Sequence, residues 1–154
     1  MLSLLRDDSQ LDLRPGVVKA AAALAVVEAG MTLIAAPVFP GSALLAQPWH
    51  PMLLLLVAEV GAAAMLIIGA ARLLFDRGRT PLVLGALLSA GISVLYMAFA
   101  VFVIAPDPAE APLTPFLLGA AVFFGVVSLG ILVLVLRSGA VRRVPDGAHR
   151  ANRV

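Results

Sequence analysis

The chain has 154 residues, of which 62% are hydrophobic and 13% are charged. A soluble domain of this size has about 45–50% apolar and about 25% charged residues, so this chain has too few polar residues to cover a globule in water. It contains no cysteine, which excludes disulfides, thiolate metal ligands and a cysteine nucleophile.

Four long apolar segments follow one another along the chain. They cover residues 16–38, 51–75, 81–105 and 113–136. About 20 residues of α-helix cross the ~30 Å hydrocarbon core of a bilayer. The chain has no polar segment that could cover such helices in water. The sequence therefore predicts one all-α membrane domain over residues 1–154, with four transmembrane helices in an up-down-up-down bundle.

The first apolar segment also has the position of a secretory signal peptide. Asp7, Asp8 and Asp12 precede it, whereas a signal core follows a positively charged stretch. Its apolar run is also longer than the roughly 7–15 residues of a signal core. We therefore expect a retained helix, with cleavage between residues 43 and 47 as the alternative.

The orientation is predicted from the charges. The loop 39–50 has no Asp, Glu, Lys or Arg, and the charged residues of the loop 106–112 are Asp107 and Glu110. All 11 basic residues fall on the other side of the predicted membrane: Arg6, Arg14, Lys19, Arg72, Arg77, Arg79, Arg137, Arg142, Arg143, Arg150 and Arg153. Cytoplasmic loops are enriched in Lys and Arg. We therefore predict an inner-membrane protein with both termini, including the tail 137–154, in the cytoplasm.

Three residues are expected to anchor the spans at the membrane interfaces. Trp49 lies at the outer edge of the second span, where tryptophan is enriched. Lys19 and Arg72 lie near the cytoplasmic edge, where their long side chains can reach the headgroups.

Two acidic residues lie inside the predicted spans. At 1.5 Å per residue, Glu28 and Glu59 are both about 12–15 Å below the outer boundary. A short loop joins their spans, so we expect antiparallel neighbours whose two carboxyls face each other near the midplane. An acid in hydrocarbon costs a few kcal/mol and normally faces the bundle interior. Two close carboxylates cannot both be charged cheaply, so at least one is expected to be neutral.

The acidic pair has two interpretations. In the first, Glu28 and Glu59 bind a proton, a cation or a cationic substrate. In the second, they hydrogen-bond across helices or pair with a basic residue of another subunit, because this chain has no Lys or Arg at that depth. Tyr96 lies at a similar depth and could donate a hydrogen bond to a carboxylate or simply pack as an aromatic ring. The other polar residues inside the spans are Thr32, Ser89, Ser93 and Ser128.

Small residues recur at helical spacing and predict helix contacts. Ala21 and Ala25 repeat every four residues in the first span, and Gly85, Ser89 and Ser93 do so in the third. Such spacing lets two helix backbones approach closely in a membrane.

Signatures of enzymes and of nucleic-acid binding are missing from the sequence. There is no Ser/His/Asp set, no metal-ligand spacing and no phosphate-binding glycine loop. The basic tail has no aromatic residue of the kind that nucleic-acid binding uses. We expect no catalysis, no metal and no cofactor.

The sequence favours an accessory or scaffolding subunit that associates through its helix faces with other integral membrane proteins or with itself. The alternative is a small oligomeric transporter, coupled to protons or cations, that uses Glu28 and Glu59. The sequence indicates neither a partner nor a substrate.

Overall fold

The computed structural model describes residues 15–36, 52–75 and 77–138. These residues form helices and turns, and no strand is found among them. In chain order the helical elements are α1 (Pro15–Ala35), α3 (Met52–Leu74), α4 (Thr80–Phe99), the π-helical turn η2 (Ala100–Ile104), the 3-10 turn η3 (Ala111–Leu113) and α5 (Thr114–Ser138). Four helical segments of this part are long and apolar enough to cross a membrane, which confirms the predicted spans.

Local sequence explains where the third and fourth spans begin. Gly78 has a φ of 100°, a left-handed conformation that glycine adopts without steric cost, and it lets the chain turn back after α3. Pro81 follows in the first turn of α4, where the missing N–H would have no helical partner. The third span ends in η2, because the Ala105 N–H bonds to the carbonyl of Ala100, five residues back.

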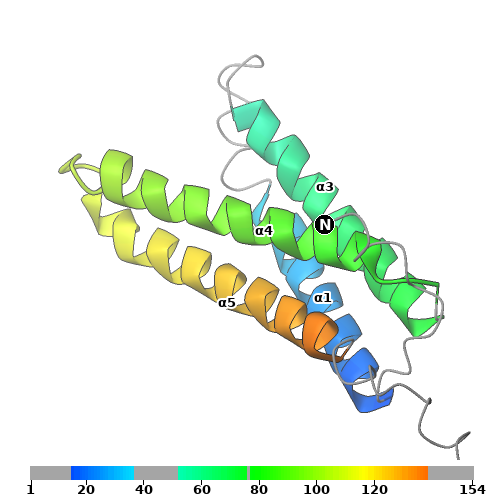
Figure 1. Ribbon diagram of the computed structural model, residues 1–154. Coiled ribbons are helices and arrows are strands. Elements are labelled where there is room, and N and C mark those ends of the chain that lie inside the picture. The colour runs from blue at the N-terminus through cyan, green and yellow to red at the C-terminus, as the bar shows by residue number, and fades with distance from the viewer. Residues whose placement is uncertain (1–14, 37–51, 76, 139–154) are drawn as a thin grey trace, which may run out of the picture.

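The helices pack as a four-membered ring. α1 contacts α3 and α5, and α4 contacts the same two helices from the other side. Figure 1 shows α4 and α5 running side by side, with α1 and α3 packed against them. This arrangement gives the bundle an interior to which all four helices contribute.

The helices come together at one end of the bundle, which we call the basic end. A buried cluster there includes Ala21 of α1, Leu73 of α3, Leu82 of α4 and Val135 of α5. The basic side chains near this end are Lys19, Arg72, Arg77, Arg79 and Arg137. Toward their other ends the helices separate, and α3 diverges from the pair α4 and α5 (Figure 1). We call this second end the open end.

Two glycines bring α3 and α4 into backbone contact. A Cβ added at Gly69 of α3 would overlap the backbone of Leu82. A Cβ added at Gly85 of α4 would lie 2.9 Å from the amide nitrogen of Leu66. A side chain at either position would push the two helices apart.

The outer surface of the bundle is apolar on all sides. Each of the four spans has between 22% and 33% of its most apolar 18-residue stretch buried within the chain. Large side chains such as Ile34, Leu54 and Val126 are 75%, 77% and 63% exposed. Such a surface is stable in hydrocarbon, and water would disfavour it.

Candidate intramembrane carboxyl site

Both predicted acidic residues are buried inside the bundle. Glu28 of α1 is 0% exposed and Glu59 of α3 is 5% exposed. A buried carboxyl needs hydrogen-bond partners, because its desolvation otherwise costs several kcal/mol.

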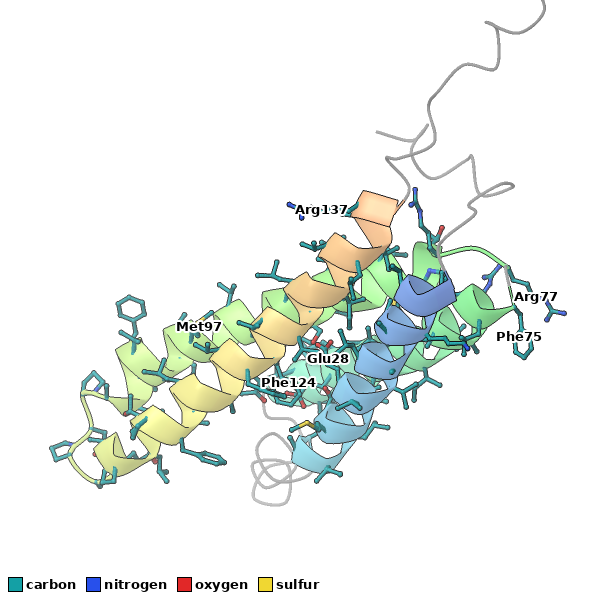
Figure 2. The ribbon with its side chains drawn as sticks, turned by 90° about the horizontal axis from the view of Figure 1, so that it is seen from below. Glu28, Phe75, Arg77, Met97, Phe124 and Arg137 are labelled. Carbon is teal, nitrogen blue, oxygen red and sulfur yellow. The ribbon has the colours of Figure 1, made fainter. Side chains whose placement is uncertain are left out.

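Glu28 finds its partners on two other helices. The hydroxyl of Ser89 on α4 donates a hydrogen bond to Oε1 of Glu28 over 2.5 Å. The hydroxyl of Ser128 on α5 donates to the same oxygen. One carboxyl thus connects α1, α4 and α5, and Figure 2 shows Glu28 inside the bundle. Ala25 and Ala29, both 0% exposed, flank it on the same buried face of α1.

Two further hydroxyls are bound within their own helices. Thr32 donates to the backbone carbonyl of Glu28 over 2.9 Å, and Ser93 donates to the backbone carbonyl of Ser89 over 3.0 Å. A Cβ added at Gly125 of α5 would lie 3.5 Å from the Cβ of Ser93. An alanine at this position would make an ordinary van der Waals contact with Ser93, so α5 lies close to the hydroxyl-bearing face of α4.

Glu59 is bound by a different residue of α4. The Tyr96 hydroxyl donates a hydrogen bond to Oε1 of Glu59 over 2.5 Å. Tyr96 and Ser89 are seven residues apart, which places them about 10 Å apart along the helix axis. The hydrogen bonds of the described residues therefore connect each carboxyl to α4. Whether the two carboxyls also face each other stays a prediction.

A cavity of about 60 Å³ lies beside this network. All four helices line it, near the level where they begin to separate. Its polar lining consists of Thr32, Glu59, Ser89, Ser93 and Tyr96. Its apolar lining consists of Ala35, Ala62, Ile92, Leu117, Ala120, Ala121 and Phe124. At about 30 Å³ for each water in the liquid, the space holds about two water molecules.

One oxygen of each carboxyl has no hydrogen-bond partner among the described residues. These atoms are Oε2 of Glu28 and Oε2 of Glu59. Glu59 also lines the cavity, so its carboxyl adjoins space that a water or a small cation can occupy. A carboxyl in this position can exchange a proton with water in the cavity or balance the charge of a bound cation.

The other residues singled out from the sequence fall into three places. Lys19 and Arg72 are exposed near the basic end, as anchors at an interface would be. Trp49 lies outside the described residues. The residues predicted for helix packing all lie on buried faces: Ala21, Ala25, Gly85, Ser89 and Ser93.

Sequence reasoning missed two features of the site. Ser89 was expected to pack, and Ser128 was noted as one polar residue among several, yet both donate to Glu28. The available signal was the scarcity of hydroxyls in these spans, since a buried acid has few other possible donors. Gly69 was also missed, because its contact depends on the position of α4.

The described residues contain no group of three or more His, Cys, Asp or Glu side chains that could hold a metal ion. The chain matches no family model, no curated protein and no solved structure.

Proposed function

We propose that the protein is a small transporter that binds a proton or a small cation at Glu59, within an oligomer in the membrane. One observation carries this proposal: Glu59 is 5% exposed, lines a mostly apolar cavity and has a carboxyl oxygen without a partner among the described residues. Tyr96 positions the carboxyl through its hydrogen bond. Glu28 has a supporting role, because hydroxyls from two helices already bind it.

The hydrogen bonds also bear on the choice between the two interpretations. A mid-membrane acid that lacks a donor in its own chain would favour pairing with another subunit. Glu28 and Glu59 both accept hydrogen bonds from this chain, from Ser89, Ser128 and Tyr96. Hydrogen bonding across helices is what the structural interpretation expects, so these bonds alone do not favour transport. They mean that the acids do not need a basic partner from another subunit, and the support for a transporter comes from the cavity beside Glu59.

The proposal includes a topology. The helices form an up-down-up-down bundle in the inner membrane, with the basic end and both termini in the cytoplasm. The clustering of Lys19, Arg72, Arg77, Arg79 and Arg137 supports this orientation, because positive charge is retained on the cytoplasmic side. The cavity then lies toward the outer side. A reporter fused after Val154 that is active outside the cell would refute the topology.

The direct test is cation flux through the purified protein in liposomes. Glu59→Gln removes the charge and keeps the shape of the side chain, so we expect flux to fall to the level of empty liposomes. Glu110→Gln is the matched control, because Glu110 is an exposed acid in the turn before α5 and should leave flux unchanged. Parent protein that carries no proton, Na⁺ or K⁺ flux would contradict the proposal.

An accessory subunit remains the second candidate. Outward-facing glycines favour it, because Gly91 and Gly119 are exposed and a Cβ added at either would meet nothing within 4 Å. A second helix could approach these positions closely, whether from another protein or from a second copy.

Purification of the tagged protein in mild detergent distinguishes the accessory subunit from the transporter. Stoichiometric recovery of other membrane proteins supports the accessory role, whereas a pure homo-oligomer supports the transporter.

A further inference from the structure

A second, larger pocket lies at the basic end, beside the turn between α3 and α4. It has a volume of about 290 Å³ and is lined by residues of both helices and of the turn. The lining includes Met65, Arg72, Arg77, Gly78, Thr80 and Leu84. The site at Glu59 involves none of these residues, so the pocket is independent of the proposed transport function.

Each arginine of the pocket has one contact within the turn that helps to position it. Nε of Arg72 donates a hydrogen bond to the backbone carbonyl of Arg77 over 3.2 Å. The guanidinium carbon of Arg77 lies 5.8 Å from the ring centroid of Phe75. With the residues that the structure describes, neither arginine forms an ion pair. Their positive charges are therefore not neutralised within the described part of the chain.

The neighbouring Arg79 has a different role. Its Nη1 donates to the backbone carbonyl of Val135 at the end of α5, 3.3 Å away. Over residues 72–79 the sequence has three arginines and one acid, Asp76, which leaves a net charge of +2. This charge attracts an anion to the pocket.

The apolar part of the lining indicates what kind of anion fits. Met65 is 38% exposed and Leu84 is 47% exposed, and both lie next to the arginines along the spans. A free phosphate would use the guanidinium groups and leave these side chains uncovered. A phospholipid satisfies both parts, because its phosphate pairs with the arginines while its acyl chain covers the apolar surface.

We propose that this pocket binds the phosphate of an anionic glycerophospholipid, with an acyl chain packed along Met65 and Leu84. Basic pockets between membrane helices are a common way to hold anionic headgroups. Arg72 and Arg77 pair with the phosphate. Gly78 lines the same pocket and adds no side chain beside the bound phosphate.

The test measures lipid binding to the full-length protein in a neutral detergent by native mass spectrometry. Phosphatidylglycerol and phosphatidylcholine with identical acyl chains are the probes. We expect the parent to prefer phosphatidylglycerol by about 25-fold, since each of the two arginines contributes about fivefold, or about 1 kcal/mol, toward an anionic lipid. Arg72→Gln and Arg77→Gln should each lose about fivefold in this preference. Arg77→Lys, which keeps the charge, should recover part of it.

Arg137→Gln is the matched control, because Arg137 is an exposed arginine in the last turn of α5 and does not line the pocket. An equal loss in this variant would mean that general surface charge attracts the lipid, and it would overturn the proposal. Unchanged binding in Arg72→Gln and Arg77→Gln would also overturn it, as would displacement of the lipid by inorganic phosphate at equal concentration. A thermal unfolding curve without added lipid confirms that each variant is folded.

Discussion

The basic end and the open end of the bundle use small residues in opposite ways. Near the basic end, Gly69 and Gly85 let the backbones of α3 and α4 touch, and the surrounding residues form one continuous buried cluster. Toward the open end, Ala62 and Ala121 line a mostly apolar cavity beside Glu59. Small residues thus give close packing in one half and leave space for a binding site in the other.

This difference explains why the candidate site lies where it does. Helix association in a membrane depends on close packing and on polar pairs. Apolar side chains gain no hydrophobic free energy from helix contact there, because the lipid around them is equally apolar. The packed half holds the helices together, so the other half can tolerate a cavity and a carboxyl with an unpartnered oxygen. The following predictions test this division, starting from the largest expected effect.

Gly69→Ala should destabilise the protein most. The added Cβ overlaps the backbone of Leu82, which cannot move aside as a flexible side chain could. Overpacking of this kind costs about 3 kcal/mol. Thermal unfolding in detergent should show a clear fall in Tm. Gly61→Ala on the same helix is the control, because nothing lies within 4 Å of its added Cβ. Equal effects of the two changes would contradict the close contact.

Ser89→Ala and Ser128→Ala should each cost about 1 kcal/mol, because each removes a donor from the buried carboxyl of Glu28. The double variant should cost more than the sum, since it leaves Oε1 without any donor. Equilibrium unfolding in mixed micelles measures these effects. Ser93→Ala should be close to neutral, because the Ser93 hydroxyl bonds within its own helix. A double variant as stable as the parent would refute the network.

Arg79→Gln should lower stability by about 0.5 kcal/mol. The change removes a hydrogen bond from the turn before α4 to the last turns of α5, where basic side chains stabilise the free carbonyls. Arg77→Gln provides the comparison, because Arg77 is exposed and makes no such link to α5. In thermal unfolding without anionic lipid, the Tm of Arg79→Gln should be slightly but reproducibly lower than the Tm of Arg77→Gln. A larger loss from Arg77→Gln would contradict the assignment.

Ala62→Val should have the smallest effect on stability, within about 0.5 kcal/mol, because its extra methyl groups enter the cavity. The same change should reduce cation flux, since it fills the space beside Glu59. Its neighbour Ala63, which is 0% exposed and lies in the packed cluster, gives the opposite expectation. Ala63→Val should lower Tm and leave the cavity unchanged. If both substitutions destabilise equally, the two halves do not differ in packing.

The four spans could be predicted because length and apolar composition alone define them. The third span was expected over residues 81–105, and the structure divides it into α4 and the π-helical turn η2. A change from α to π hydrogen bonding has no signal in a run such as Ala100–Ile104. The apolar residues there suit either form.

The site could be predicted only in part. Glu28, Glu59 and Tyr96 stand out because polar residues are rare in these spans, although the sequence leaves open whether the tyrosine donates to a carboxylate or only packs as a ring. Which acid receives its hydrogen bond depends on how each helix is rotated about its axis. Spans that are apolar on all sides carry little information about that rotation. For the same reason, Gly61 and Gly69 look alike in the sequence although their surroundings differ completely.

The double hydrogen bond at Glu28 has a consequence for how the protein is made. α1 leaves the ribosome first, and its mean hydropathy of 1.8 is the lowest among the four described spans. Its acid has no interhelical donor until Ser89 and then Ser128 are synthesised, 61 and 100 residues later. At about 5–20 residues per second, the second donor arrives about 5–20 s after Glu28. During this interval the Glu28 carboxyl must be kept away from lipid by the insertion machinery or by contact with α3. We therefore expect α1 to be held stably in the bilayer only after α5 has been inserted.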